Sequence, residues 1–263
     1  MNVVVLLKQV PDTETKVRID SGGRSIDTGD IKWIVNPYDE YAVEAALRLQ
    51  DGVGASVTIL SMGPQRAVES IRTALAMGAD QAVLVDDPAT EGSDALGKAR
   101  VLAAALKNID FDLVLCGHRA VDDDENQVGI MVAEFMEIPH LGLAVSIQVT
   151  DGKVKIERPV EGARVTLEAT LPALVTLGGA HAVWNPRYAS LPGIMKAKKK
   201  PLEIKTLADL GLSGDEVGTQ GAKIRITSME LPAQRQTGRV LEGDTAEKAK
   251  ELIRLLHEEA KVI

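Results

Sequence analysis

One stretch of the chain, residues 112–135, constrains the fold more than any other. It opens with a short apolar run at 113–116, which is typical of a buried parallel strand. The chain then turns at Gly117 and passes through a polar loop before an apolar pattern with helical spacing begins at Val128. In an open parallel sheet, ligands bind beyond the carboxyl ends of the strands, and the N–H groups that begin the next helix attract phosphate. The stretch therefore predicts a binding crevice.

Three earlier apolar runs, at residues 3–7, 57–60 and 82–85, precede this stretch and alternate with helical patterns. Alternating strands and helices build α/β folds, in which right-handed crossovers cover both faces of a parallel sheet. We therefore predict an α/β fold for residues 3–136, with an open, Rossmann-like parallel sheet and helices on both faces.

A well-capped helix is predicted to begin after residue 36. Asn36 is a favourable N-cap, Pro37 suits the first helical position, and acidic residues such as Asp39 favour the positive end of the helix dipole. A capped helix explains this spacing by itself. Its first turn is nevertheless expected near the same sheet edge as the loop at residues 117–127.

A phosphate-loop motif is incomplete in this sequence. Gly92, Gly97 and Lys98 have its spacing, but Ala99 stands where the motif needs a hydroxyl group for magnesium. A helix capped by Asp94, or by the serine before it, is the favoured interpretation. A full G-x-G-x-x-G motif is also absent, which disfavours a nicotinamide cofactor.

The polar loop carries the most varied chemistry. The three carboxylates at residues 122–124 have the ligand type of a metal site, but adjacent residues on regular backbone cannot all point to one ion. Acids near a helix start are also stabilised by the helix dipole. We favour a nucleotide bound by backbone N–H groups and by the amides of Asn126 and Gln127. His118 and Arg119 would supply positive charge beside the acids.

Two further candidates have ordinary structural explanations. Lys8 follows the first strand, where a lysine is usually a solvated cap, although the same sheet edge suits a neighbour of a phosphate or flavin. His118 has no nucleophile beside it, so general-base catalysis is not expected. No Ser-His-Asp set, activated cysteine or metal cluster emerges, and we predict neither catalytic nor metal-binding residues.

The composition excludes several classes of protein. The net charge is −8 over 263 residues, which argues against nucleic acid as the main partner. Cys116 is the only cysteine, so an internal disulfide is excluded and a reducing compartment is expected. The apolar start of the chain is too short for a signal peptide, and no apolar run approaches the ~18 residues of a membrane span. We expect a cytoplasmic protein without direct membrane insertion.

The pattern changes after residue 139. Alternating apolar residues flank Asp151 and Gly152, which together are a hairpin turn signal. From residue 185 onwards little periodicity is left, and an apolar segment at 191–195 precedes the lysine-rich residues 196–200. An exposed apolar segment with a basic flank is a plausible docking site.

The end of the chain reads as a polar linker at 213–221 followed by one amphipathic helix from 245 to about 260. We therefore predict two domains. Residues 1–184 form the α/β nucleotide-binding domain with a β-hairpin addition, and residues 185–263 form an extended C-terminal arm and helix for contacts with partners.

Several long segments together resemble the β subunit of electron transfer flavoproteins over essentially the whole chain. The matching segments are VNPYDEYAVEAALRL (35–49), RTALAMGAD (72–80), GHRAVDDDENQVG (117–129), VKIERPVEGARVTLEATLPALVT (154–176) and NPRYASLPGIMKAKKKP (185–201). Long motifs in one order are more specific than any single glycine pattern.

The resemblance implies an adenine nucleotide α-hydrolase-like α/β domain and an arm that wraps an α subunit. It also implies a structural AMP in this subunit and an FAD held mainly by the α subunit. The cofactor-binding positions implied are Leu6, Asn36, Pro37, Tyr38, Asp39, Met62, Gly117, His118, Arg119, Ala120, Val121, Asp122, Asp123, Asp124, Glu125, Asn126, Gln127 and Val128.

The same resemblance implies an electron carrier that serves fatty acid oxidation rather than an enzyme. Donors of the acyl-CoA dehydrogenase type would dock on the arm, and electrons would pass through FAD towards an electron transfer flavoprotein–quinone oxidoreductase. The docking positions implied are Leu191, Pro192, Ile194, Met195, Lys196 and Lys199.

An alternative within the family is a flavin-bifurcating protein whose β subunit binds a second FAD and reacts with NADH. The segment KQVPDT at residues 8–13 resembles that type, and Thr13 replaces a tyrosine found near the flavin in many non-bifurcating relatives. Against it, Asp123 and Glu125 would repel the second phosphate of a dinucleotide. We favour AMP, and an unrelated ATP-binding or ATP-hydrolysing α/β protein is the third possibility.

Overall fold

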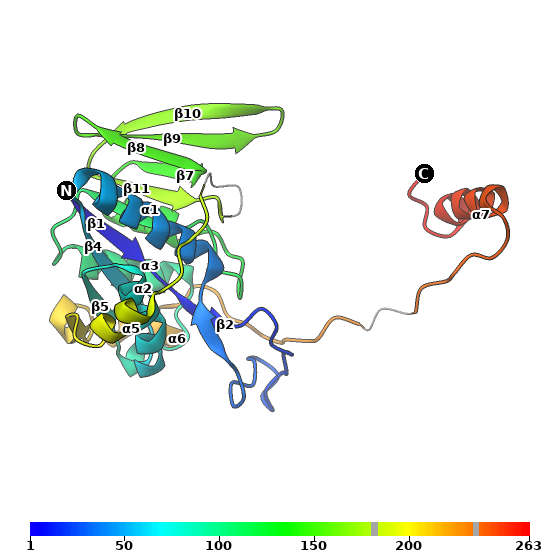
Figure 1. The fold of residues 1–263 in the computed structure, drawn as a ribbon. Coiled ribbons are helices and arrows are strands. Elements are labelled where there is room, and N and C mark those ends of the chain that lie inside the picture. Colours follow the sequence, from blue (N-terminus) through cyan, green and yellow to red (C-terminus); the bar gives the residue numbers. More distant parts are fainter. Residues whose placement is uncertain (180–183, 234–236) are drawn as a thin grey trace.

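A computed structural model describes residues 1–179, 184–233 and 237–263 of the protein. Its centre is a seven-stranded parallel sheet with the strand order β12-β5-β4-β1-β6-β11-β7 (Figure 1). The strands are β1 (Asn2–Leu6), β4 (Ser56–Met62), β5 (Gln81–Val85), β6 (Leu113–Gly117), β7 (His140–Ala144), β11 (Ala173–Leu177) and β12 (Leu202–Lys205). The predicted α/β fold with an open parallel sheet is confirmed.

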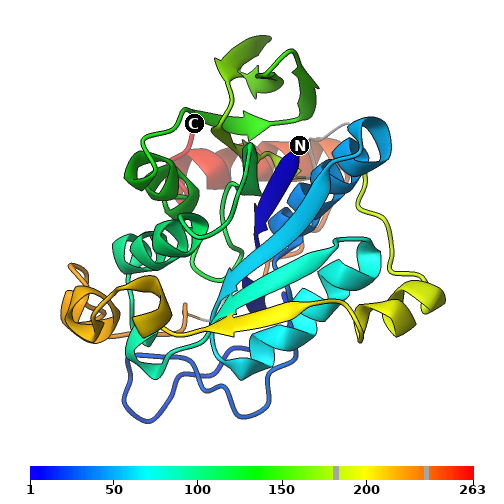
Figure 2. The same ribbon diagram turned by 90° about the vertical axis from the view of Figure 1, so that its left-hand side faces the viewer.

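Helices cover both faces of the sheet, as Figure 2 shows. They are α1 (Pro37–Val53), α2 (Val68–Met77), α3 (Ala95–Leu106) and α4 (Val128–Phe135). Val3 and Val5 of β1 belong to the core under α1 and α2, whereas Val4 and Leu6 belong to the core under α3 and α4. Each buried aliphatic side chain contributes about 1.5–3 kcal/mol. Burial on both faces explains why the strands read as continuous apolar runs.

Helix α3 begins as the sequence predicts. The Asp94 carboxylate accepts a hydrogen bond of 2.9 Å from the Gly97 N–H, and the N-cap is therefore confirmed. Gly97 and Lys98 lie inside a regular helix rather than in a glycine-rich loop. Short 3₁₀ turns lead into the second and third helices, η1 (Gln65–Ala67) before α2 and η2 (Pro88–Thr90) before α3.

Two smaller sheets are added to this core. An antiparallel sheet has the order β10-β9-β8, with β8 (Ser146–Thr150), β9 (Lys153–Val160) and β10 (Ala163–Thr170). The predicted turn is confirmed, since Asp151 has φ 51° and Gly152 has φ 72°, the left-handed pair of a two-residue hairpin. A two-stranded ribbon, β2 (Gln9–Pro11) with β3 (Trp33–Val35), follows the first strand.

The C-terminal part returns to the main sheet before it leaves it. After α5 (Leu191–Ala197), β12 pairs with β5 at the edge of the sheet, so the sheet extends past the predicted domain boundary at residue 184. The turns η4 (Ala208–Leu210), η5 (Gly214–Glu216) and α6 (Gly218–Gly221) follow. The division into two domains stays a prediction.

The expectation of a polar linker at 213–221 is wrong. These residues form η5 and α6, where Val217 is fully buried and the Gly218 N–H donates to the Ser93 Oγ at 2.8 Å. Val217 belongs to the core under α3 and α4, a contact between distant segments that the polar sequence did not reveal. Beyond it, the chain runs away from the sheet to the predicted amphipathic helix, α7 (Thr245–Glu258) (Figure 1). Within the described residues, no helix is both long and apolar enough to cross a bilayer.

Candidate functional site

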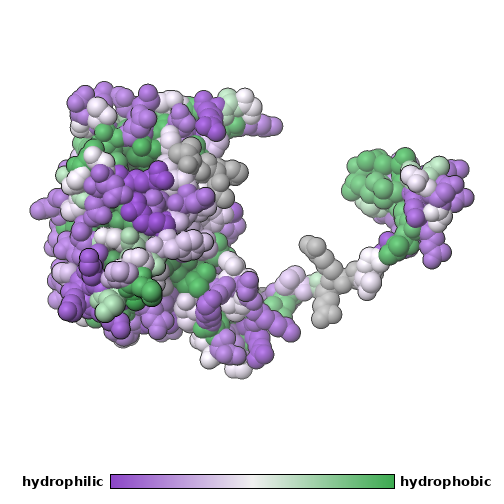
Figure 3. All heavy atoms as spheres, viewed as in Figure 1, coloured by the Kyte–Doolittle hydropathy of each residue, from purple (hydrophilic) through white to green (hydrophobic). Residues whose placement is uncertain are grey.

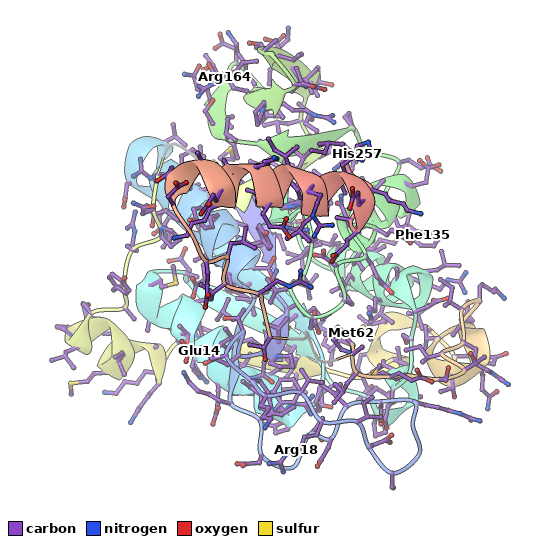
Figure 4. The ribbon with its side chains drawn as sticks, turned by 90° about the vertical axis from the view of Figure 1, so that its right-hand side faces the viewer. Glu14, Arg18, Met62, Phe135, Arg164 and His257 are labelled. Atoms are coloured by element: carbon purple, nitrogen blue, oxygen red, sulfur yellow. The ribbon has the colours of Figure 1, made fainter. Side chains whose placement is uncertain are left out.

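The candidate site is a pocket at the topological switch point of the sheet. Strands β4 and β5 lie on one side of β1, whereas β6, β11 and β7 lie on the other. The pocket opens where β1 and β6 end, between residues 6–8 and residues 116–129. Figure 4 views the molecule from this carboxyl edge, with Met62 at the end of β4 labelled. Ligands of open α/β sheets bind at such a point.

Asn36 joins the start of α1 to the loop after β6. Its Nδ2 donates to the Arg119 carbonyl oxygen at 2.9 Å, and its Oδ1 accepts from the Val121 N–H at 3.2 Å. The helix begins at Pro37 with Asn36 at the N-cap position, as predicted, but the Asn36 amide makes no cap hydrogen bond to the helix. The side chain is buried, and the loop backbone offers both a donor and an acceptor for it.

The Asp39 carboxylate connects the ends of the two strands that flank the switch point. It accepts hydrogen bonds from the Lys8 N–H at 2.8 Å and from the Gly117 N–H at 2.9 Å. Burial raises the pKa of Asp39 to about 7, although the two N–H groups favour the charged form. Asp39 reaches this place because it lies in the first turn of α1, two residues after Pro37.

Gly117 is required by the close approach of helix α1. A Cβ atom at this position would lie 2.6 Å from the Tyr38 Cβ and 2.7 Å from the Asp39 Oδ1. The absence of a side chain at Gly117 therefore lets the helix approach the strand end. The next residue, His118, is oriented by an Nδ1–H that donates to the Leu177 carbonyl oxygen at 2.8 Å.

Lys8 and Lys98 hold the acidic side of the loop. The Lys8 Nζ lies 2.7 Å from both Asp122 Oδ1 and Asp123 Oδ2, and the Lys98 Nζ lies 3.2 Å from Asp123 Oδ2. Burial opposes the charged form of Lys8, but these ion pairs raise its pKa above the ordinary value. Burial likewise opposes the charged form of Asp123, yet bonds from both lysines hold its pKa below the usual range.

The three consecutive aspartates do not share one partner. Asp124 points away from the pocket to the Arg119 guanidinium at 2.9 Å, and Arg119 in turn donates to the Tyr38 hydroxyl at 2.7 Å. Among the described residues, no group of three or more His, Cys, Asp or Glu side chains could hold a metal ion. The carboxylates of this loop are engaged with cations of the chain itself.

The loop backbone explains its unusual sequence. Asp124 has φ 56° and Asn126 has φ 53°, and Asp and Asn are the non-glycine residues that best tolerate this left-handed region. Asp123 and Glu125, which alternate with these two residues along the chain, line the pocket. The Glu125 Oε2 lies 3.8 Å from the Lys98 Nζ and has no hydrogen-bond partner among the described residues.

Comparison with known proteins now bears on this geometry. The model of the electron transfer flavoprotein domain family matches residues 24–210. The electron transfer flavoprotein subunit beta of Bacillus subtilis is 41% identical over 264 residues and is covered, like this chain, over 100% of its length. The chain belongs to the electron transfer flavoprotein β-subunit family. The protein of that name from Bos taurus is 38% identical over 260 residues, which cover 97% of this chain and 99% of its own.

The structure brings together most of the positions at which the electron transfer flavoprotein resemblance implies a cofactor. Those that line the pocket are Leu6, Asn36, Asp39, Met62, Gly117, His118, Arg119, Ala120, Asp123, Glu125, Asn126, Gln127 and Val128. Five others, Pro37, Tyr38, Val121, Asp122 and Asp124, do not line the pocket.

Sequence reasoning left six lining residues out of the predicted site. They are Leu7, Lys8, Lys98, Leu102, Cys116 and Gly129. Two of them could have been found from the sequence, because Lys8 follows a predicted strand and Lys98 belongs to the incomplete phosphate-loop motif. Cys116 lies buried in the wall, and burial together with the nearby Asp39 raises its thiol pKa, which makes the thiolate unavailable.

The predicted docking positions of this family member lie on α5 or, for Lys199, just after it, and none of them lines the pocket. Ser190 caps the helix by accepting from the Gly193 N–H at 3.1 Å. Leu191 is 80% exposed and Met195 is 73% exposed, and Ile194 is also exposed. Pro192, Lys196 and Lys199 are exposed beside them. Large exposed apolar side chains in a contiguous segment are typical of interaction surfaces.

Proposed function

We propose that this chain is the β subunit of a heterodimeric electron transfer flavoprotein and that its pocket binds a structural AMP. The observation that carries the proposal is the pocket at the β1–β6 switch point, which is where an open parallel sheet receives a ligand. In this proposal the AMP has no redox role, and the chain is an electron-carrier subunit rather than an enzyme.

The residues around the pocket fit an adenine mononucleotide. Leu6, Met62 and Leu102 give the pocket an apolar side that suits a base. Two lysines and the N-terminal N–H groups of α4 would hold one phosphate. The Glu125 Oε2, which accepts no hydrogen bond from the described residues, would accept one from a ribose hydroxyl, as acidic residues do in other nucleotide sites.

The α subunit would hold most of the FAD, with this chain completing the FAD site. FAD supplies the redox chemistry, taking electrons from a donor dehydrogenase and passing them towards a quinone oxidoreductase. This chain contributes the surfaces that contact the α subunit and the donor dehydrogenase. Leu252 and Ile253 of α7 are 49% and 59% exposed, and Figure 3 shows the apolar side of the terminal helix standing free of the α/β domain. An unpartnered apolar face of this kind suits contact with the α subunit.

Donor dehydrogenases of the acyl-CoA type would dock on α5. The proposal rests on the exposure of Leu191 and Met195 and on the lysines beside them. An apolar anchor with a basic rim suits a partner that has a pocket for the anchor and acidic residues around that pocket.

A second candidate is the bifurcating type, with FAD in place of AMP, because the segment at residues 8–13 resembles it. The charges of the pocket favour AMP over this candidate. Asp123 and Glu125 both line it, so a second phosphate would meet carboxylates that are only partly offset by Lys8 and Lys98.

A double variant tests this charge argument. Asp123→Gly with Glu125→Thr removes both lining carboxylates, and we expect it to weaken the discrimination against dinucleotides, so that FAD enters the pocket. Asp124→Asn is the matched control, since it removes a carboxylate of the same loop that points out of the pocket. The measurement is the nucleotide content of the purified heterodimer. Unaltered AMP content and no FAD uptake in the double variant would count against the charge argument.

A further inference from the structure

The docking helix α5 is fixed to its neighbour α2 through its backbone. The Lys200 side chain, just beyond α5, reaches the carboxyl end of α2. Its Nζ donates to the carbonyl oxygens of Leu75 at 3.0 Å, Gly78 at 3.1 Å and Ala79 at 2.6 Å. These carbonyl groups lie at the end of a helix, where they lack intrahelical partners and carry the negative end of the dipole.

Arg72 of α2 makes the opposite connection. Its Nη1 donates to the carbonyl oxygens of Ala197 at 2.6 Å and Lys200 at 2.9 Å, at the carboxyl end of α5. Arg72 of α2 therefore caps the end of α5, and Lys200, three residues after α5, caps the end of α2. Gly193 completes the contact, because a Cβ at this position would overlap the Ala76 carbonyl oxygen.

A second anchor lies on the chain that leads into α5. The Arg187 Nε and Nη2 donate to the buried Glu44 carboxylate at 2.8 Å and 3.2 Å, and the Nη2 also reaches Asp51 at 2.8 Å. A bidentate pair of this kind is directional as well as strong. The segment is thus held on α1 before the helix and on α2 after it, while Leu191 and Met195 stay exposed.

We propose that Arg72 and Lys200 are positioning residues for partner recognition, which act by presenting the exposed side chains of α5 in one fixed orientation. The inference rests on the proposed docking function of α5. A surface that is rigid before binding loses less conformational entropy on association, so its partner binds more tightly. Arg72 and Lys200 use their charges on backbone carbonyls and do not themselves form the docking surface.

The test combines amide hydrogen exchange with steady-state kinetics on the full heterodimer. In Lys200→Met we expect exchange in residues 192–198 to be about tenfold faster or more, with exchange in the central strands unchanged. With an acyl-CoA dehydrogenase as donor, we expect the KM for the heterodimer to rise about tenfold, equivalent to about 1.4 kcal/mol, at unchanged kcat and flavin content. Lys107→Met, which removes an exposed lysine elsewhere, is the control and should change neither quantity.

Arg72→Gln removes the other half of the contact and replaces Lys200→Met if that variant fails to fold. Unchanged exchange in α5 for the folded variant would overturn the proposal. Faster exchange with an unchanged KM, when Leu191→Ala raises the KM, would overturn the role in recognition while leaving docking on α5 intact. An unchanged KM in Leu191→Ala as well would overturn the proposed docking function and this inference with it.

Discussion

The Lys8 ammonium group lies 2.7 Å from the Asp123 carboxylate, although 115 residues separate them in the chain. The contact joins the end of β1 to the loop after β6, across the switch point of the sheet. Lys98 reaches the same carboxylate from α3. The cations that would hold a ligand phosphate are therefore already paired, and a bound phosphate has to share or replace their carboxylate partners.

Lys98→Met should weaken the binding of AMP. A charge-assisted hydrogen bond contributes about 1.5–3 kcal/mol, so the Kd for AMP should rise about tenfold or more. The measurement is calorimetric titration of AMP into nucleotide-free protein. Lys107→Met, at the far end of the same helix, should leave the Kd unchanged. Equal Kd values for wild type and Lys98→Met would show that Lys98 does not contact the nucleotide.

Gly117→Ala should destabilise the fold through the contact of β6 with α1. The added methyl group would lie within 2.7 Å of the Tyr38 Cβ and the Asp39 carboxylate, and overpacking of this kind costs about 1–3 kcal/mol. Gly52→Ala is the control, because nothing lies within 4 Å of a Cβ there and alanine favours the helix by about 1 kcal/mol. Urea unfolding measures both. A free energy of unfolding for Gly117→Ala equal to that of wild type would contradict the described packing.

Asp39 should make the stability of the protein depend on pH. Its pKa is raised from 3.8 to about 7 in the folded state, so the folded state holds the proton more tightly than the unfolded state does. The contribution is fully present below about pH 4 and is lost as the pH rises to about 7, with a total of up to about 4 kcal/mol. Asp39→Asn should lack this decline.

The measurement is the free energy of unfolding of wild type and Asp39→Asn between about pH 4.5 and pH 8. The variant has one fewer acceptor for the Lys8 and Gly117 N–H groups, so an overall loss of stability is expected at every pH. The difference between the two proteins should change across the range. A constant difference would show that the carboxyl group keeps its ordinary pKa.

Leu191→Ala should slow electron acceptance from an acyl-CoA dehydrogenase about tenfold or more, roughly 1.4 kcal/mol, with flavin content unchanged. The reason is the 80% exposure of this side chain on α5, which leaves it free to enter a pocket of the donor. Val53→Ala, which truncates an apolar side chain with 57% exposure elsewhere on the surface, is the control. Equal rates in Leu191→Ala and wild type would exclude Leu191 as an anchor.

The alternation of strands and helices was visible in the sequence because both patterns are local. Burial of residues 3–6 on both faces of the sheet produces an unbroken apolar run. The helices are recognised by apolar residues at helical spacing. The edge strand β12 was missed because four residues are too few for a periodic pattern and none of the four is buried.

Contacts between distant segments could not be read in the same way. Asn36 before Pro37 has the sequence of a cap, yet its partners are backbone groups of residues 119 and 121, which no local pattern reveals. In the sequence, Lys98 stood out only as part of an incomplete phosphate-loop motif. In the structure, its contribution to the site is the ion pair with Asp123. The left-handed backbone at Asp124 and Asn126 had a sequence signal, since both residue types favour it.

The nucleotide content of the co-expressed heterodimer tests the central claim most directly. The complex is denatured, and every released nucleotide is identified and quantified by chromatography and mass. We predict one FAD and one AMP per heterodimer. In the Lys98→Met heterodimer we expect the AMP content to fall before the FAD content does. Two FAD and no AMP would contradict the account, because Asp123 and Glu125 would then tolerate a dinucleotide and the protein would be of the bifurcating type.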